Sequence, residues 1–227
     1  MKLYGYWRSL ATYRVRAALA LKGMALDEPE IPIDILRGRQ FDPVYRALNP
    51  QSVVPALVID AGAPLVQSMA ILEYLEETKP QPPLLPADAR GRARVRGLAQ
   101  ICVSDGHPFI VPRIRVYLEK VLGVDEAARN RWLQHWSLKA LEAVEGHLAH
   151  EPGTGRFCHG EQPTLADVCV ASQVIAAKDY CRCDVSGVPT VMRIYGECMK
   201  LEAFSRSHPS RQPGAPADLR PEDAGAR

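Results

Sequence analysis

The sequence predicts an α/β domain followed by an all-helical domain. Two observations support this: strand and helix patterns alternate over residues 1–79, and helical patterns alone fill residues 88–208. A proline-dense segment, 80–87, lies between them and is expected to be an interdomain linker, because closely spaced prolines interrupt regular structure. Residues 209–227 are rich in Pro, Arg, Asp, Gly and Ala, and are expected to form a flexible tail.

The first domain begins with a short aromatic and aliphatic run, Lys2–Tyr6, that is typical of a strand. Helix-forming residues follow it, and Gly23 stands where a helix C-terminus favours glycine. The alternation strand-helix-strand-helix-strand-strand-helix predicts a thioredoxin-like unit, in which helices cover a mixed sheet. The later elements are expected at 30–33 (strand), 41–48 (helix), 53–59 (strand), 64–66 (strand) and 68–78 (helix). Ser68 is expected to cap the last helix, and Glu73, Glu76 and Glu77 are expected to face water.

The second domain shows helical spacing almost throughout. A helix from Arg90 is expected to be interrupted near Pro108 and Pro112, and a long amphipathic helix is expected over 126–148. Thr164 followed three residues later by Asp167 indicates a capping box at the start of a nearly all-apolar, buried helix.

Composition excludes several classes of function. The chain has 227 residues, 47% hydrophobic and 24% charged, with a formal net charge of +2, which gives no strong attraction to nucleic acid or a membrane surface. No amino-terminal secretory pattern and no apolar stretch of membrane-spanning length is evident, so a cytoplasmic protein with reduced cysteines is expected. The pair Cys181 and Cys183 lacks a second cluster, so no metal site is predicted.

Two hydroxyl groups, those of Ser9 and Thr12, lie between the first strand and the first helix. A hydroxyl at this place can cap the helix, because the first backbone N–H groups of a helix lack intrahelical acceptors. It can also donate to a bound anion, including a thiolate, at the positive end of the helix dipole. The residues alone leave both interpretations open.

The run from Arg8-Ser9 to Arg14-Val15-Arg16 resembles the start of zeta-class glutathione transferases, a family that includes maleylacetoacetate and maleylpyruvate isomerases. The family's usual Ser-Ser-Cys stands here as Ser9-Leu10-Ala11. The resemblance implies the glutathione transferase fold, glutathione as cofactor, a homodimer and a role in aromatic amino acid catabolism. It extends through Gln40–Pro50, Gln67-Ser68 with Glu73–Glu77, and Pro163–Asp167.

The resemblance also implies roles in binding glutathione. Pro55 matches the cis-proline of thioredoxin-like folds, and the backbone of Val54 would pair with the cysteinyl part of glutathione. Gln67 and Ser68 would hold the γ-glutamyl end, where a helix N-terminus suits a carboxylate. Gln40 would lie near the glycyl end.

Three basic residues are candidates for the substrate. Arg8 precedes the hydroxyl pair, and a guanidinium matches a carboxylate in two-point geometry. His107 and Arg113 resemble the His-Pro pair and downstream arginine of the maleylpyruvate isomerase branch, and His107 is expected to contact both glutathione and substrate. Arg14 and Arg16 are expected to be structural.

The function expected from this resemblance is cis–trans isomerisation of a maleyl-type diacid, with Ser9 donating to the glutathione sulfur while Thr12 caps or supports. Two alternatives remain: a general glutathione-conjugating transferase, and a non-catalytic glutathione-fold binding protein, which the replacement by Leu10 and Ala11 leaves open.

Overall fold

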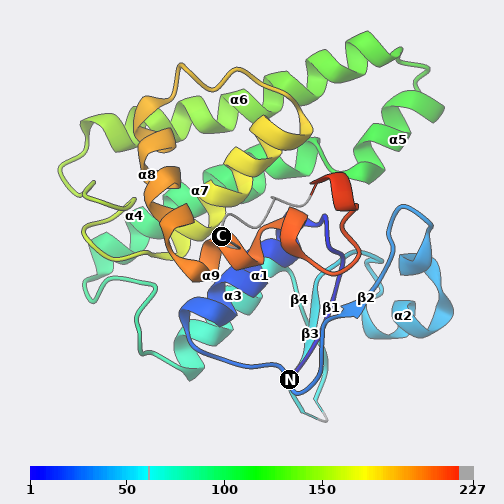
Figure 1. Ribbon diagram of the computed structural model, residues 1–227, viewed down its shortest axis with the longest axis horizontal. Helices are drawn as coiled ribbons and strands as arrows, with labels where there is room; N and C mark the ends of the chain where they lie inside the picture. The colour runs from blue at the N-terminus through cyan, green and yellow to red at the C-terminus, as the bar shows by residue number, and fades with distance from the viewer. Residues whose placement is uncertain (61, 220–227) are drawn as a thin grey trace, which may run out of the picture. The chain divides into compact units, whose positions relative to one another are not determined.

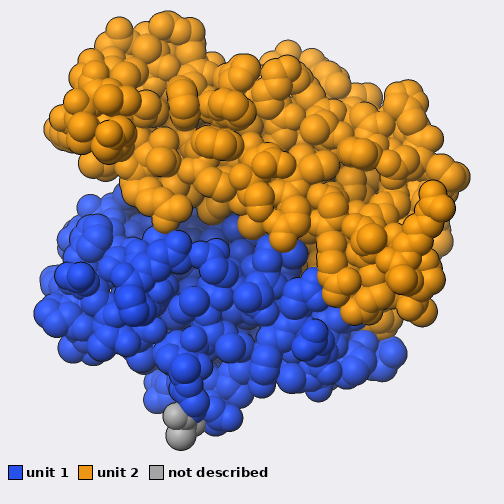
Figure 2. Space-filling model, turned by 180° about the vertical axis from the view of Figure 1, so that it is seen from behind, with its two compact units in different colours: residues 1–82, 201–227 blue, residues 83–200 orange. Residues whose placement is uncertain are grey.

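The structure is a computed structural model that describes residues 1–60 and 62–219. They form two compact units, shown in Figure 2: one holds residues 1–82 and the chain from Leu201 onward, and the other holds residues 83–200. The helical unit therefore ends at Lys200, whereas the sequence pattern assigns residues up to 208 to the helical domain.

A mixed four-stranded sheet in the order β2-β1-β3-β4 forms the centre of the first unit. β1 runs parallel to β2 and antiparallel to β3, and β3 runs antiparallel to β4. The predicted element order and mixed sheet are confirmed, although the strands are shorter than expected. They span Lys2–Gly5 (β1), Ile31–Pro32 (β2), Ala56–Val58 (β3) and Leu65–Val66 (β4).

Helix α1 (Leu10–Leu21) packs against α3 (Ser68–Thr78) and α9 (Glu202–Ser207), and Figure 1 shows α9 alongside α1. α1 is buried on most of its circumference, which fits its run of Ala, Val and Leu. The unit also contains a 3-10 turn, η1 (Arg39–Phe41), and the short helix α2 (Pro43–Leu48).

A buried ion pair joins α1 to α3. Lys22, at the C-terminal end of α1, pairs with Glu76, and its ammonium also donates to the carbonyls of Lys79 at 2.7 Å and Pro82 at 2.9 Å. Lys22 is 1% exposed and Glu76 6% exposed, so the prediction that Glu76 faces water is wrong. The reason is that a lysine ammonium withdrawn from water needs an anionic partner, and the packing of α1 on α3 supplies Glu76.

The second unit is helical. All eleven residues of α7 are buried, and α7 packs against α4, α6 and α8, which confirms the predicted buried helix. The predicted interruption is present as a π-helical segment, η2 (Ile101–Gly106), and a 3-10 turn, η3 (His107–Phe109), that contains Pro108. The helices are α4 (Ala89–Gln100), α5 (Pro112–Lys120), α6 (Glu126–His150), α7 (Leu165–Ile175) and α8 (Pro189–Lys200), with a second π-helical segment, η4 (Ala176–Tyr180).

The start of α7 has the predicted capping box. Asp167 accepts from the Thr164 backbone N–H at 2.7 Å and from the Thr164 hydroxyl at 2.8 Å. Its second carboxylate oxygen accepts from the Cys158 N–H at 2.8 Å, which fixes the loop before the helix. Burial raises the pKa of Asp167, while the hydrogen bonds from Cys158 and Thr164 oppose that rise.

Residues 208–219, which follow α9, pack within the first unit, and this differs from the flexible tail expected from residue 209. It forms two 3-10 turns, η5 (Pro209–Arg211) and η6 (Ala217–Leu219), and buries Pro209 and Ala215. Gly214 has φ +88°, a backbone conformation that favours glycine, and lies against the Trp7 ring. The part of the expected tail from residue 220 to 227 lies outside the described residues.

Three further findings concern classes of site. No helix in the described ranges 1–60 and 62–219 is both long and apolar enough to cross a membrane. The same residues contain no group of three or more His, Cys, Asp or Glu side chains that could hold a metal ion. The six cysteines are free thiols.

Candidate functional site

The sheet topology directs four loops to one end of the sheet. β1 and β2 are parallel, so the segments that follow them start from the same edge. β3 is antiparallel to β1 and β4 is antiparallel to β3, so the segment before β3 and the segment after β4 lie at that edge as well. These four segments carry or lead to the predicted residues of the first unit: Ser9, Gln40, Val54-Pro55 and Gln67-Ser68.

Ser9 is the N-cap of α1. Its backbone is extended (φ −69°, ψ 121°), and its Oγ accepts from the Thr12 N–H at 3.2 Å. Of the two roles expected for Thr12, capping or support, the capping role is wrong, because α1 begins at Leu10 and the capping position is the residue before it. A hydroxyl that accepts one hydrogen bond still has its own proton to donate, so capping leaves Ser9 able to bind an anion.

Thr12 is completely buried, and its Oγ1 has no hydrogen-bond partner among the described residues. Its methyl group lies so close to Gly5 that a Cβ on Gly5 would approach it to 2.4 Å. Thr12 therefore packs α1 against β1, and its hydroxyl is not accessible to a ligand in this structure.

The Val54–Pro55 peptide bond is cis, as predicted. Val54 is buried in a cluster with Tyr6, Tyr45 and Ala56, and this cluster brings the proline loop against the segment that leads to Ser9. The Tyr45 hydroxyl donates to the Val53 carbonyl at 2.6 Å, and this hydrogen bond fixes the loop to α2. Pairing of the Val54 backbone with a ligand stays a prediction.

Gln67 adopts φ +68°, a conformation that residues other than glycine rarely take. It occupies the N-cap position of α3, and its Nε2 donates to Gln51 Oε1 at 2.7 Å. Ser68 is the first helical residue and its Oγ accepts from Arg14 Nε at 3.0 Å, so the predicted cap by Ser68 is wrong. The Gln67 side chain makes no capping hydrogen bond at the start of α3, and a helix N-terminus suits an anion.

Gln40 lies in η1, and its Oε1 is buried without a hydrogen-bond partner among the described residues. A buried amide oxygen normally has a donor, because an unsatisfied acceptor is unfavourable. Because this oxygen is buried, like the Thr12 hydroxyl, contact between Gln40 and a ligand stays a prediction.

The three candidate substrate residues are divided between the units. Arg8 is partly exposed in the loop before α1. His107 is partly exposed at the start of η3, and Arg113 is exposed in the first turn of α5, both in the second unit. Their roles stay predictions.

Two further residues hold the predicted ones in place, and sequence reasoning missed the first of them. Gln51 orients Gln67, and Arg14, 2% exposed, orients Ser68. Arg14 was predicted to be structural, and its position between Tyr13 and Val15 on an apolar helix was the available signal. A buried guanidinium requires an acceptor, but the spacing of residues does not reveal which one.

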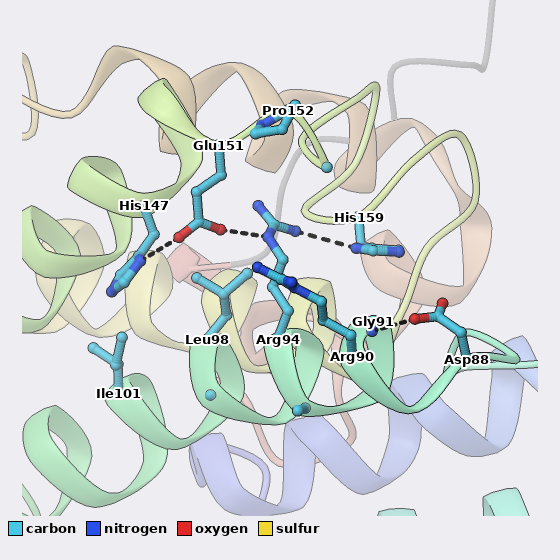
Figure 3. Close-up of a pocket in the computed structure, with 13 residues that line it drawn as sticks. Asp88, Arg90, Gly91, Arg94, Leu98, Ile101, His147, Glu151, Pro152 and His159 are labelled. Atoms are coloured by element: carbon cyan, nitrogen blue, oxygen red, sulfur yellow. Dashed lines mark hydrogen bonds and ion pairs between the residues drawn. The ribbon is translucent and has the colours of Figure 1, made fainter.

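The second unit contains a cavity of about 710 Å³ between α4 and the segment at the end of α6 (Figure 3). Arg94 lines this cavity. It pairs with Glu151 and donates to the Thr154 hydroxyl at 2.8 Å and the Cys158 carbonyl at 2.6 Å. Hydrogen bonding to His147 and to Arg94 lowers the pKa of Glu151. The network fixes the loop after α6 to α4.

Comparison with known proteins identifies the family. The model of the glutathione S-transferase N-terminal domain matches residues 1–77, and that of the C-terminal domain matches residues 126–189. The chain is also 44% identical to a maleylpyruvate isomerase of Ralstonia sp. over 214 residues, which covers 94% of this chain and 99% of the relative.

This chain belongs to the glutathione S-transferase family. The transferase also resembles a solved maleylacetoacetate isomerase from Methylobacterium extorquens AM1 with bound malonate and glutathione, with a TM-score of 0.92 and 45% identity, over 96% of this chain and 100% of the other. A solved maleylpyruvate isomerase described as a bacterial zeta-class transferase matches with a TM-score of 0.90 and 43% identity, over 95% and 100% of the two chains. The predicted family and fold are confirmed.

Proposed function

We propose that this transferase is a glutathione-dependent cis–trans isomerase of a maleyl-type diacid. The observation that carries the proposal is the Ser9 hydroxyl at the N-terminus of α1, at the sheet end to which the proline loop and the start of α3 also come. Two similar proteins named as isomerases support it, one of them solved with glutathione and malonate, a dicarboxylate.

The residues at this sheet end fit glutathione. The tripeptide has a carboxylate at each end, and the start of α3 beside Gln67 suits the γ-glutamyl carboxylate. Gln40, in η1, would lie near the glycyl end, as the family resemblance implies. The backbone of Val54, held in the cis-proline loop, would pair with the cysteinyl residue.

When bound, glutathione supplies a thiolate that adds to the cis double bond and is expelled after the resulting single bond has rotated, so it is regenerated. The chain's contribution is to favour the charged sulfur. Ser9 donates its hydroxyl proton toward that sulfur, and the dipole of α1 reinforces the effect, so the thiol pKa falls. Arg8, His107 and Arg113 would orient the two carboxylates of the substrate.

Substitution of Ser9 in two ways tests this role. Ser9→Ala removes both the cap and the donor, whereas Ser9→Gly removes the donor at a capping cost of only a few tenths of a kcal/mol. Loss of a hydrogen bond to a charged acceptor, worth roughly 1.5–3 kcal/mol, should raise the thiol pKa of bound glutathione by about 1–2 units in both variants. Thiolate absorbance against pH measures it, and an unchanged pKa in Ser9→Gly contradicts the proposed donor.

The alternatives are separated by substrate. A glutathione-dependent assay should compare maleylpyruvate, maleylacetoacetate and chlorodinitrobenzene under the same conditions. Isomerisation of either diacid without conjugation supports the proposal, and conjugation alone supports a general transferase. Glutathione binding with neither activity supports the binding protein that Leu10 and Ala11 leave open.

The proposal includes a homodimer in the cytoplasm, which rests on the family resemblance. Analytical ultracentrifugation at micromolar concentration measures the oligomer directly, and a monomer at every concentration would contradict this part.

A further inference from the structure

The Arg16 guanidinium binds three separate segments of the first unit. Its Nη2 donates to the Tyr6 carbonyl at 2.9 Å, its Nε to Glu30 Oε2 at 2.7 Å, and its Nη1 to the Ser207 carbonyl at 3.2 Å. The side chain is only 9% exposed, so these bonds are shielded from solvent. Arg16 thus joins the loop before α1, the segment before β2, and the end of α9.

The Tyr6 carbonyl has a second donor, the backbone N–H of Ser9 at 2.9 Å. This bond closes the turn that sets the direction of the Ser9 side chain. Arg16 and Ser9 therefore share one acceptor, and Arg16 also approaches the next carbonyl, that of Trp7, at 3.5 Å. The Arg16 guanidinium therefore restrains the same turn that the Ser9 amide closes.

Glu30 fixes Arg16 in turn. Its two carboxylate oxygens accept from Nε at 2.7 Å and from Nη2 at 3.3 Å, a two-point geometry that holds the guanidinium plane. Glu30 reaches this position past Gly5, where a Cβ would lie 2.4 Å from its Oε1. A side chain at Gly5 would therefore have to displace both this carboxylate and the Thr12 methyl group.

We propose that Arg16 is a positioning residue, which holds the turn from Tyr6 to Ser9 so that the Ser9 hydroxyl points at the glutathione sulfur, and that it makes the end of α9 part of this support. The inference rests on the proposed function. It gives the C-terminal segment, which also covers Trp7 through Gly214, a structural connection to the candidate thiol site.

Arg16→Lys is the decisive variant, because it retains the positive charge near the site and loses the planar, multiple contact. We expect the thiol pKa of bound glutathione to rise by roughly 0.5–1 unit, about half the effect of Ser9→Ala, and kcat to fall roughly threefold to tenfold with KM for glutathione nearly unchanged. Amide exchange at Ser9 should also accelerate.

The matched control is Arg94→Lys. Arg94 likewise pairs with a glutamate and donates to a distant backbone carbonyl, but it lies in the second unit. Arg94→Lys should lower the melting temperature and leave the thiol pKa and Ser9 amide exchange unchanged. A thiol pKa shift in Arg94→Lys equal to that in Arg16→Lys would overturn the proposal.

The double variant Ser9→Ala with Arg16→Lys identifies the route of the effect. If Arg16 acts through Ser9, the double variant has the thiol pKa of Ser9→Ala within about 0.3 unit, the usual scatter of independent effects. Additive shifts would mean that Arg16 acts on the sulfur without Ser9, and would overturn the inference. If the wild-type chain binds glutathione without lowering its thiol pKa, the proposed role of Ser9 is refuted. If the wild-type chain lowers the thiol pKa and Arg16→Lys lowers it equally, only the role of Arg16 is refuted.

Discussion

Asp167→Ala tests whether the capping box of α7 serves folding. The carboxylate is completely buried and accepts from the Cys158 N–H, the Thr164 N–H and the Thr164 hydroxyl. The substitution leaves both backbone N–H groups without their acceptor, and it removes the link between the preceding loop and α7.

The magnitude follows from these contacts. Each buried N–H left without an acceptor costs about 1–3 kcal/mol, or roughly 2–6 kcal/mol for the pair. Removal of a carboxylate whose pKa burial has raised relieves part of that cost, so we expect a net loss of roughly 2–4 kcal/mol in the free energy of unfolding. For a chain of this size, that lowers the melting temperature by roughly 5–15 °C.

Thermal unfolding and urea titration measure the loss, and turnover per folded molecule at a temperature well below the transition measures the function. Thr164→Ala, which removes the capping hydroxyl but retains the carboxylate, is the matched control and should cost only about 1 kcal/mol. A loss of turnover in Asp167→Ala at wild-type stability would refute the folding role.

Three other predictions test single contacts. Thr12→Val should leave the thiol pKa of bound glutathione unchanged and maintain or raise stability, because the Thr12 hydroxyl has no partner among the described residues; a pKa rise by thiolate absorbance would contradict this. Gln67→Glu should weaken glutathione binding in calorimetry, because a second carboxylate would repel the γ-glutamyl end, whereas equal affinity would remove Gln67 from the site. The pKa of Glu151 in the folded protein lies below its ordinary value of 4.5. The ionised carboxylate therefore stabilises the folded state fully above pH 4.5, and this contribution is lost as the pH falls through the folded-state pKa. Glu151→Gln should therefore lower the melting temperature at pH 7, and its effect should shrink as the pH falls through the lowered pKa of Glu151; a pH-independent difference would contradict the ion-pair origin.

The features of the fold that were predictable depend on local patterns. The capping signature at Thr164 and Asp167 lies within one turn, and the buried run after it has no competing interpretation. Glu76 was not predictable in the same way. It appears as one of several glutamates on an amphipathic helix, and its partner Lys22 lies 54 residues earlier. Only tertiary packing decides that this carboxylate is withdrawn from water.

Sequence-based prediction was also limited at the candidate site, where the residues concerned lie only three positions apart. Sequence reasoning found the cis-proline and the segments that meet at the sheet end, because residue type and element order determine them. It could not distinguish the roles of Ser9 and Thr12, since a shift of the helix start by one turn would exchange them. The structure starts α1 at Leu10, and the packing of Thr12 against Gly5 removes the second hydroxyl from the surface.

The replacement of the family's second serine and cysteine makes Ser9 more important than its position alone indicates. Leu10 is 5% exposed and is part of the core, and Ala11 offers no polar group to a ligand. Thr12 is buried, so within residues 9–12 the Ser9 hydroxyl is the accessible side-chain donor. Ser9 is thus the single accessible hydroxyl of this turn, so the thiol pKa of bound glutathione should respond to its loss with the full effect of one charge-assisted hydrogen bond, and to Arg16→Lys with about half of that effect.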